Sequence, residues 1–194
     1  MRIHRVVGAL ATATVTWGLL AGCGSKPTPV THPPPRAVSS APATSKPPHN
    51  QADVVFLQNM ILHHARTISM SQLAHNQATS PQVKDLATRI EAEQSPQTQQ
   101  MSALLTGWGI PVPATTGAGA SGGIGNGKMP GMVSGAVFDR IFLNMMTVDH
   151  QGAVDMSQTE LAQGTNPATR TLAQQILSTQ QAQSSEIQAL LQVI

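Results

Sequence analysis

Several residue types that would support other folds and functions are scarce in this 194-residue chain. It has no tyrosine, 3% aromatic residues, 10% charged residues and one cysteine, Cys23, which excludes an intramolecular disulfide. From Gln51 onward, six Lys and Arg residues stand against nine Asp and Glu residues, a balance of −3. This region therefore lacks the basic stripe of a nucleic-acid-binding protein, and we expect no nucleic-acid partner.

The motifs of several enzyme classes are missing as well. With four glutamates and no Glu-x-x-His motif, the chain lacks the ligands of a ferritin-type di-iron oxidoreductase. Spacing alone leaves a Ser-His-Asp hydrolase open, but there is no nucleophile elbow, which needs a strand before the serine. The glycine-rich stretch 106–132 has no preceding strand and no GK[ST], which argues against phosphate binding. We expect no enzymatic activity.

The N-terminus has the features of a lipoprotein signal peptide. The cationic head MRIHR precedes an apolar run, VVGALATATVTWGLL, that is too short for a comfortable membrane span. The following LLAGC, ending at Cys23, fits the lipobox, in which the cysteine thiol receives a diacylglycerol. We expect residues 1–22 to be removed and acyl chains on Cys23 to hold the protein at the extracytoplasmic face of the cell membrane. An ordinary signal peptide with an incidental cysteine is the alternative.

The next segment predicts a tether. Residues 24–50 are rich in Pro, Ser and Thr and contain few large apolar groups, so burial cannot offset the entropy cost of ordering them. We assign residues 23–50 to the lipid anchor and a semi-extended tether, with His32 and His49 as solvated tether residues. Residues 51–194 are long enough to form one domain with a sizeable core.

This domain contains an internal duplication. Residues 53–105 align without gaps on residues 139–191, with 19 identities in 53 positions. In each copy, apolar residues at steps of three and four predict two helices, separated by a turn in which Ser80 or Asn166 caps the second helix before a proline. Residues 106–133 connect the copies. Four helices with one long crossover predict an all-α, ferritin-like four-helix bundle; Pro96 predicts a kink in one of them.

Histidines and methionines gather on the first helix of each copy. Met60, His63 and His64 are three and four positions apart, so their side chains can converge within about one turn. Met70 lies about 10 Å further along the axis, too far to join this cluster from one helix alone. It could belong to a second layer or meet a ligand from the other copy across the bundle. Thioether and imidazole together suit Cu(I) or Ag(I) far better than Mg, Ca or Mn. A soft-metal site is therefore predicted here.

The second copy repeats this arrangement, with Met146, Asp149 and His150 in the compact cluster and Met156 in the distant position. Asp149 replaces the first histidine and could bind the metal or hydrogen-bond to His64 or His150 across the core. The predicted metal ligands are Met60, His63, His64, Met70, Met146, Asp149, His150 and Met156.

Core packing is the competing explanation, because methionine is a common filler of helical cores. In that case the protein is a metal-free structural or interaction lipoprotein, with Met60 and Met146 buried among apolar residues and the histidines hydrogen-bonded. The pairing of Met with His in both copies favours the metal, since an ionisable group on an apolar face needs partners when buried.

The phrases FLQNMILHHARTISM and FLNMMTVDHQGAVDM, each followed by a helix that begins with proline, resemble domain-of-unknown-function family 305. The resemblance covers about residues 52–192 and implies a ferritin-like bundle; some members are exported copper- or silver-binding proteins that use Met and His. The chain departs from the family pattern at Asp149, commonly histidine, at Ala65-Arg66, commonly Gln-Gly, and at Gln97 and Gln183, commonly glutamate. These departures bear on the number of metal ions bound and on whether copy one binds any.

Overall fold

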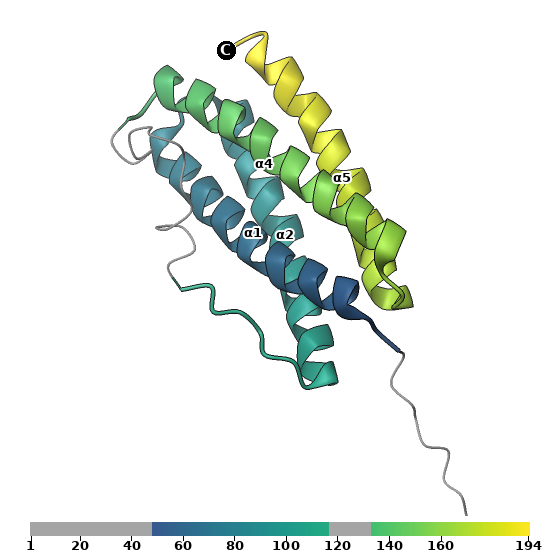
Figure 1. The fold of residues 1–194 in the computed structure, drawn as a ribbon. Helices are drawn as coiled ribbons and strands as arrows, with labels where there is room; N and C mark the ends of the chain where they lie inside the picture. Colours follow the sequence, from purple (N-terminus) through teal and green to yellow (C-terminus); the bar gives the residue numbers. More distant parts are fainter. Residues whose placement is uncertain (1–47, 117–132) are drawn as a thin grey trace, which may run out of the picture. The chain divides into compact units, whose positions relative to one another are not determined.

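The computed structural model describes residues 48–116 and 133–194, which form four long helices and, within these ranges, no strand (Figure 1). The helices are α1, Gln51–Gln77; α2, Pro81–Trp108; α4, Ala136–Gln163; and α5, Pro167–Leu191. The predicted all-α four-helix bundle is confirmed. Cys23 and the loop methionines Met129 and Met132 lie outside the described residues.

The helices begin where their capping residues place them. Ser80 and Asn166 accept hydrogen bonds from backbone N–H groups in the first turns of α2 and α5, as predicted. Asn50 caps α1 in a capping box with Asp53, in which each side chain accepts from the other residue's backbone N–H. Helix α2 continues through Pro96 as one element.

Two aspartates tie the copies together. The carboxylate of Asp139, in the first turn of α4, accepts from the backbone N–H groups of Thr79 (3.0 Å) and Ser80 (2.9 Å) in the α1–α2 turn. Asp53, in the first turn of α1, accepts in the same way from Asn166 (2.9 Å) in the α4–α5 turn. Each copy therefore holds the turn of the other.

The crossover is long because α2 ends far from the start of α4. The Gly135 N–H donates to the Gln77 carbonyl (2.8 Å), which puts the start of α4 beside the α1–α2 turn. Helix α2 runs away from this turn for 28 residues, about 42 Å at 1.5 Å per residue. The end of α2 and the start of α4 therefore lie at opposite ends of the bundle.

At the far end of α2, the ring of Trp108 stacks on His49 with centroids 4.1 Å apart. The Pro48 carbonyl also accepts from the side chain of Asn166 (3.2 Å). His49 is exposed, as predicted for a solvated residue, but its ring also packs on an aromatic ring of the bundle. The last residues before α1 contact the bundle.

The apolar core consists of two clusters at opposite ends of the bundle. The Met60 cluster contains Val54, Phe56, Leu57, Met60, Ile61, Met101, Leu105, Ala153, Leu172, Ala173 and Ile176. The Met146 cluster contains Ala74, Ala78, Val83, Leu86, Ala87, Ile90, Phe138, Phe142, Leu143, Met146 and Ile187. In the part of the chain that the structure describes, no helix is long and apolar enough to cross a membrane.

Candidate metal centre

A layer of buried polar side chains separates the two apolar clusters. Its members are less than a tenth exposed and come from all four helices; they are His63, His64, Thr67, Gln94, His150, Gln180 and Gln183. On every helix these positions fall between residues of the Met60 cluster and residues of the Met146 cluster. We call this set the polar layer. Buried polar groups need partners, so each hydrogen bond in it constrains the chemistry available there.

His64 is fully buried and points one ring nitrogen at α2. Its Nε2 lies 2.9 Å from Oε1 of Gln97, while Nδ1 has no hydrogen-bond partner among the described residues. Burial, helped by the nearby imidazoles of His63 and His150, lowers the pKa of His64 to about 3. The ring is therefore neutral at neutral pH, with its proton on Nε2 and a lone pair on Nδ1.

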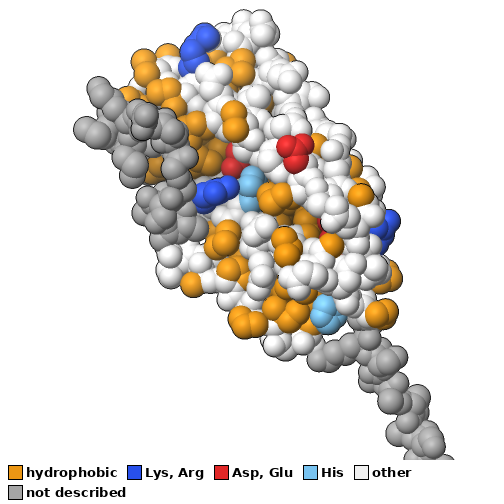
Figure 2. All heavy atoms as spheres, viewed as in Figure 1, with side chains coloured by type: hydrophobic (Ala, Val, Ile, Leu, Met, Phe, Trp, Pro, Cys, Tyr) orange, Lys and Arg blue, Asp and Glu red, His pale blue; other side chains and the backbone are white. Residues whose placement is uncertain are grey.

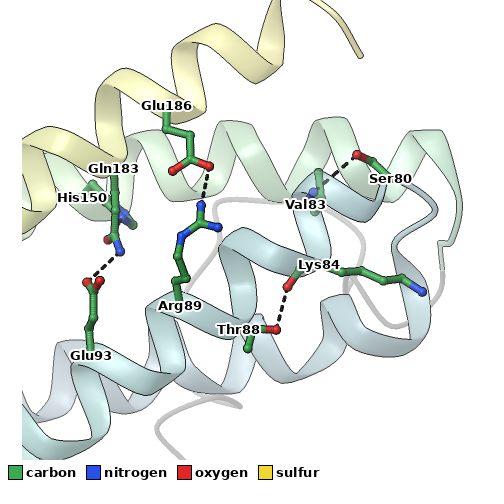
Figure 3. Close-up of polar contacts among 9 residues, drawn as sticks. All are labelled: Ser80, Val83, Lys84, Thr88, Arg89, Glu93, His150, Gln183 and Glu186. Carbon is green, nitrogen blue, oxygen red and sulfur yellow. Dashed lines mark hydrogen bonds and ion pairs between the residues drawn. The ribbon is translucent and has the colours of Figure 1, made fainter.

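His150 repeats this arrangement and adds a third group (Figure 3). Its Nε2 lies 2.9 Å from Oε1 of Gln183, and the amide nitrogen of Gln183 donates to Oε2 of Glu93 (2.9 Å). Because a carboxylate accepts, the Gln183 nitrogen must face Glu93 and its oxygen must face His150. The proton of His150 is thereby placed on Nε2, and Nδ1 again has no partner in the described chain.

Burial also lowers the pKa of His150, against the opposing effects of its bond to Gln183 and of the Asp149 charge. His150 is thus neutral at neutral pH, like His64. The pKa of Glu93 moves the other way, since burial raises it while the charge of Arg89 opposes the change.

His63, and not His64 or His150 as predicted, is the histidine that pairs with Asp149. Its Nε2 donates to the backbone carbonyl of Asp149 (3.0 Å) and lies 3.4 Å from Oδ1 of the same residue. The Thr67 hydroxyl donates to Oδ2 of Asp149 (2.6 Å), so the carboxylate is held beside α1. Burial lowers the pKa of His63 although the Asp149 charge opposes this, and Nδ1 is once more without a partner among the described residues.

The polar layer therefore offers three buried imidazole lone pairs. The rings of His63 and His64 are 6.1 Å apart between centroids. His150 is close enough to lower the pKa of His64, and His63 is close enough to lower the pKa of His150. Neutral imidazole nitrogen without a proton is the form that binds transition metals. In the described ranges, no three His, Cys, Asp or Glu side chains are grouped to hold a metal by themselves. A metal here would need thioether ligands as well.

The methionines flank this layer. Met60 and Met146 are fully buried, one in each apolar cluster and one helical turn from His64 and His150. Met70 packs against the Met146 cluster and Met156 against the Met60 cluster. Each distant methionine thus lies with the compact methionine of the other copy, and the structure does not bring all four sulfurs into one cluster.

Sequence reasoning did not assign Gln97, Gln183 or Glu93 to the site. A signal for the two glutamines exists, because each stands 33 positions after its histidine and both histidines recur in the duplication. Glu93 has no such signal, since Thr179 occupies its equivalent position in copy two.

Comparison with known proteins identifies the family. The profile described as domain of unknown function (DUF305) matches residues 53–191, about the whole helical domain. The chain belongs to the DUF305 family. Among curated proteins, no sequence matches it.

Solved structures of DUF305 proteins share the fold. A DUF305 fragment from Deinococcus radiodurans is 25% identical, with a TM-score of 0.62 over 76% of this chain and 100% of that one. CopM in its Cu(I)-bound form is 26% identical, with a TM-score of 0.61 over 72% and 95% of the two chains. CopM in an Ag-bound form is also 26% identical, with a TM-score of 0.63 over 72% of this chain and 95% of that one. A DUF305 protein from Streptomyces coelicolor, at 24% identity and a TM-score of 0.64 over 72% and 91%, supports the fold alone.

Proposed function

We propose that this DUF305 protein binds Cu(I) or Ag(I) in its polar layer and takes part in metal buffering or tolerance, without catalysing a reaction. The proposal rests on three buried, neutral imidazoles whose Nδ1 atoms have no hydrogen-bond partner among the described residues. The similarity to CopM, which was crystallised with Cu(I) and Ag, supports the same metals. Export and lipid anchoring at Cys23 would place the domain at the extracytoplasmic face of the membrane.

The proposed ligands are the Nδ1 atoms of His63, His64 and His150 and the thioethers of Met60 and Met146. These neutral nitrogen and sulfur atoms would coordinate a soft ion, and the ion would give each Nδ1 atom the partner that it lacks. Asp149 is already engaged with Thr67 and His63, so we assign it to orienting His63. Met70 and Met156, partly buried at the edges of the apolar clusters, are the positions through which an ion would reach the compact methionines.

The metal-free alternative also has support. Met60 and Met146 pack in apolar clusters and all three histidines are hydrogen-bonded, which is what an interaction lipoprotein without metal would show. The unpartnered Nδ1 atoms favour the metal, because a buried polar group left without a partner costs about 1–3 kcal/mol.

Titration of the purified full chain with Cu(I) against a competing chelator tests the proposal. We expect high-affinity binding that weakens at least tenfold in the double variant Met60→Leu/Met146→Leu, which conserves volume and should fold. Met101→Leu is the matched control, since Met101 is equally buried but its equivalent in copy two is Ile187. Absence of binding by the wild-type chain, or equal binding by the double variant, His64→Ala/His150→Ala and the control, would favour the metal-free alternative.

A further inference from the structure

The two copies differ in the hydrogen-bonded groups that follow the histidines His64 and His150. Behind His150, the chain of bonds runs from α4 through Gln183 on α5 to Glu93 on α2 (Figure 3). Behind His64 it stops at Gln97, because Thr179 occupies the position equivalent to Glu93 and offers no carboxylate. The duplication thus supplies an internal comparison in which one imidazole is backed by an acid and the other is not.

The groups around His150 could also accommodate its other tautomer, in which the proton lies on Nδ1. If the amide of Gln183 turned by half a rotation, its nitrogen would face His150 and would need a lone pair on Nε2. The ring proton would then lie on Nδ1, where the backbone carbonyl of Met146, which is near enough to raise the pKa of His150, could accept it. In that state neither ring nitrogen is free to bind a metal.

Glu93 opposes this turn. A turned amide would put the Gln183 oxygen against the Glu93 carboxylate, so two acceptors would meet without a proton between them. Glu93 itself is held near this position on α2, one turn after Arg89, which forms an ion pair with Glu186 on α5 (Figure 3). The acid and its cationic neighbour are thus both fixed across the α2–α5 interface.

We propose that Glu93 is a positioning residue for the metal site: through the Gln183 amide it holds the proton of His150 on Nε2 and leaves Nδ1 free as the ligand atom. The role in metal binding rests on the function proposed above, whereas the control of the tautomer does not. Loss of a group that orients a ligating histidine in this way typically lowers metal affinity about 10–100-fold. We expect His150 to depend on Glu93 and His64 to be indifferent to it.

The test combines ring-nitrogen NMR with the Cu(I) titration. The full chain is prepared with ¹⁵N-labelled histidine, and His150 and His64 are assigned from the signals lost in His150→Gln and His64→Gln. In the wild type, His150 should show a protonated Nε2 and an unprotonated Nδ1. In Glu93→Ala its signals should shift toward the other tautomer, and Cu(I) affinity should fall at least tenfold.

Two variants separate positioning from a general structural effect. Glu93→Gln keeps the size of the side chain, but its amide can donate as well as accept, so it no longer fixes the Gln183 amide and should shift the His150 tautomer and lower the affinity as Glu93→Ala does. Thr179→Ala, at the equivalent position in copy two, should leave both rings and the affinity unchanged. A wild-type tautomer of His150 in Glu93→Ala would overturn the proposal, and so would an equal shift of His64. If the tautomer changes but no variant or wild-type chain binds Cu(I), the positioning role stands and the metal function fails.

Discussion

Glu160 and Asp53 form a buried carboxyl pair at the residue scale. Glu160 is 1% exposed, and no N–H or O–H group of the described residues donates to its side chain. The charged groups that act on it are Asp53 and, with the opposite effect on its pKa, Arg170. Burial and the Asp53 carboxylate raise the pKa of Glu160 to about 8. Gly164 is part of this arrangement, because a Cβ there would overlap the Glu160 carboxyl. Copy one has Ala74 and Ala78 at these positions, so the pair belongs to one end of the bundle only.

This pair predicts a loss of stability as pH rises. The folded-state pKa of Glu160 lies above its usual value of 4.5, so its contribution is present below 4.5 and is lost as pH rises toward 8. The buried histidines have lowered pKa values and act in the opposite direction, below pH 6.5. Between pH 6.5 and 8, the free energy of unfolding should therefore fall, by at most about 1.4 kcal/mol per pH unit. Denaturant unfolding at several pH values measures it.

Glu160→Gln is the variant for this experiment, since its amide can donate to Asp53 without titrating. Its free energy of unfolding should be nearly constant from pH 6.5 to 8. The same decline in wild type and variant would show that another group titrates in this range.

At the element scale, each hairpin is held by the other copy. Asp53 and Asp139 stand at equivalent positions in the first turns of α1 and α4, and each satisfies backbone N–H groups of the opposite turn. The N–H groups at the start of a helix have no intrahelical partner, so a carboxylate there can accept hydrogen bonds from them. Its negative charge also interacts favourably with the positive end of the helix dipole. Reciprocal capping thus fixes which end of one hairpin meets which end of the other.

Asp139→Ala should therefore be strongly destabilising. It removes the acceptor of two N–H groups in the α1–α2 turn, and we expect the free energy of unfolding to drop by roughly 2–4 kcal/mol. Chemical denaturation measures this change. Asp85→Ala, at an exposed position of α2, is the control and should change stability by no more than about 0.5 kcal/mol. Equal effects of the two substitutions would contradict the capping role.

At the scale of the whole domain, the polar layer separates the two apolar clusters of the core. The surface, by contrast, carries little charge: on the face shown in Figure 2, single blue and red side chains are separated by white and orange ones. A metal ion that binds the polar atoms of this core can bind the folded chain but not the unfolded chain, in which these atoms are no longer held together. Metal binding should then be coupled to the stability of the entire bundle.

Addition of Ag(I) or Cu(I) should consequently raise Tm. At a free concentration 100-fold above Kd, the gain is about 2.7 kcal/mol, which corresponds to roughly 5–10 °C for a domain of this size. Thermal unfolding followed by circular dichroism, with and without the metal, measures the shift, and a chelator should reverse it. The Met60→Leu/Met146→Leu variant should show little change. A wild-type Tm that is indifferent to both metal and chelator would support the metal-free alternative.

The sequence by itself determined the helices and the equivalence of their positions. Helical periodicity, the caps Ser80 and Asn166 and the ungapped duplication are local or linear properties, so they predict four helices and place a Met–His pair on two of them. Tertiary structure alone decided the contacts between them: that His63 meets Asp149, and that Glu93 stands behind His150. These contacts join helices distant in sequence, and the proton positions that leave Nδ1 free depend on them, because a tautomer is set by the neighbouring donor or acceptor.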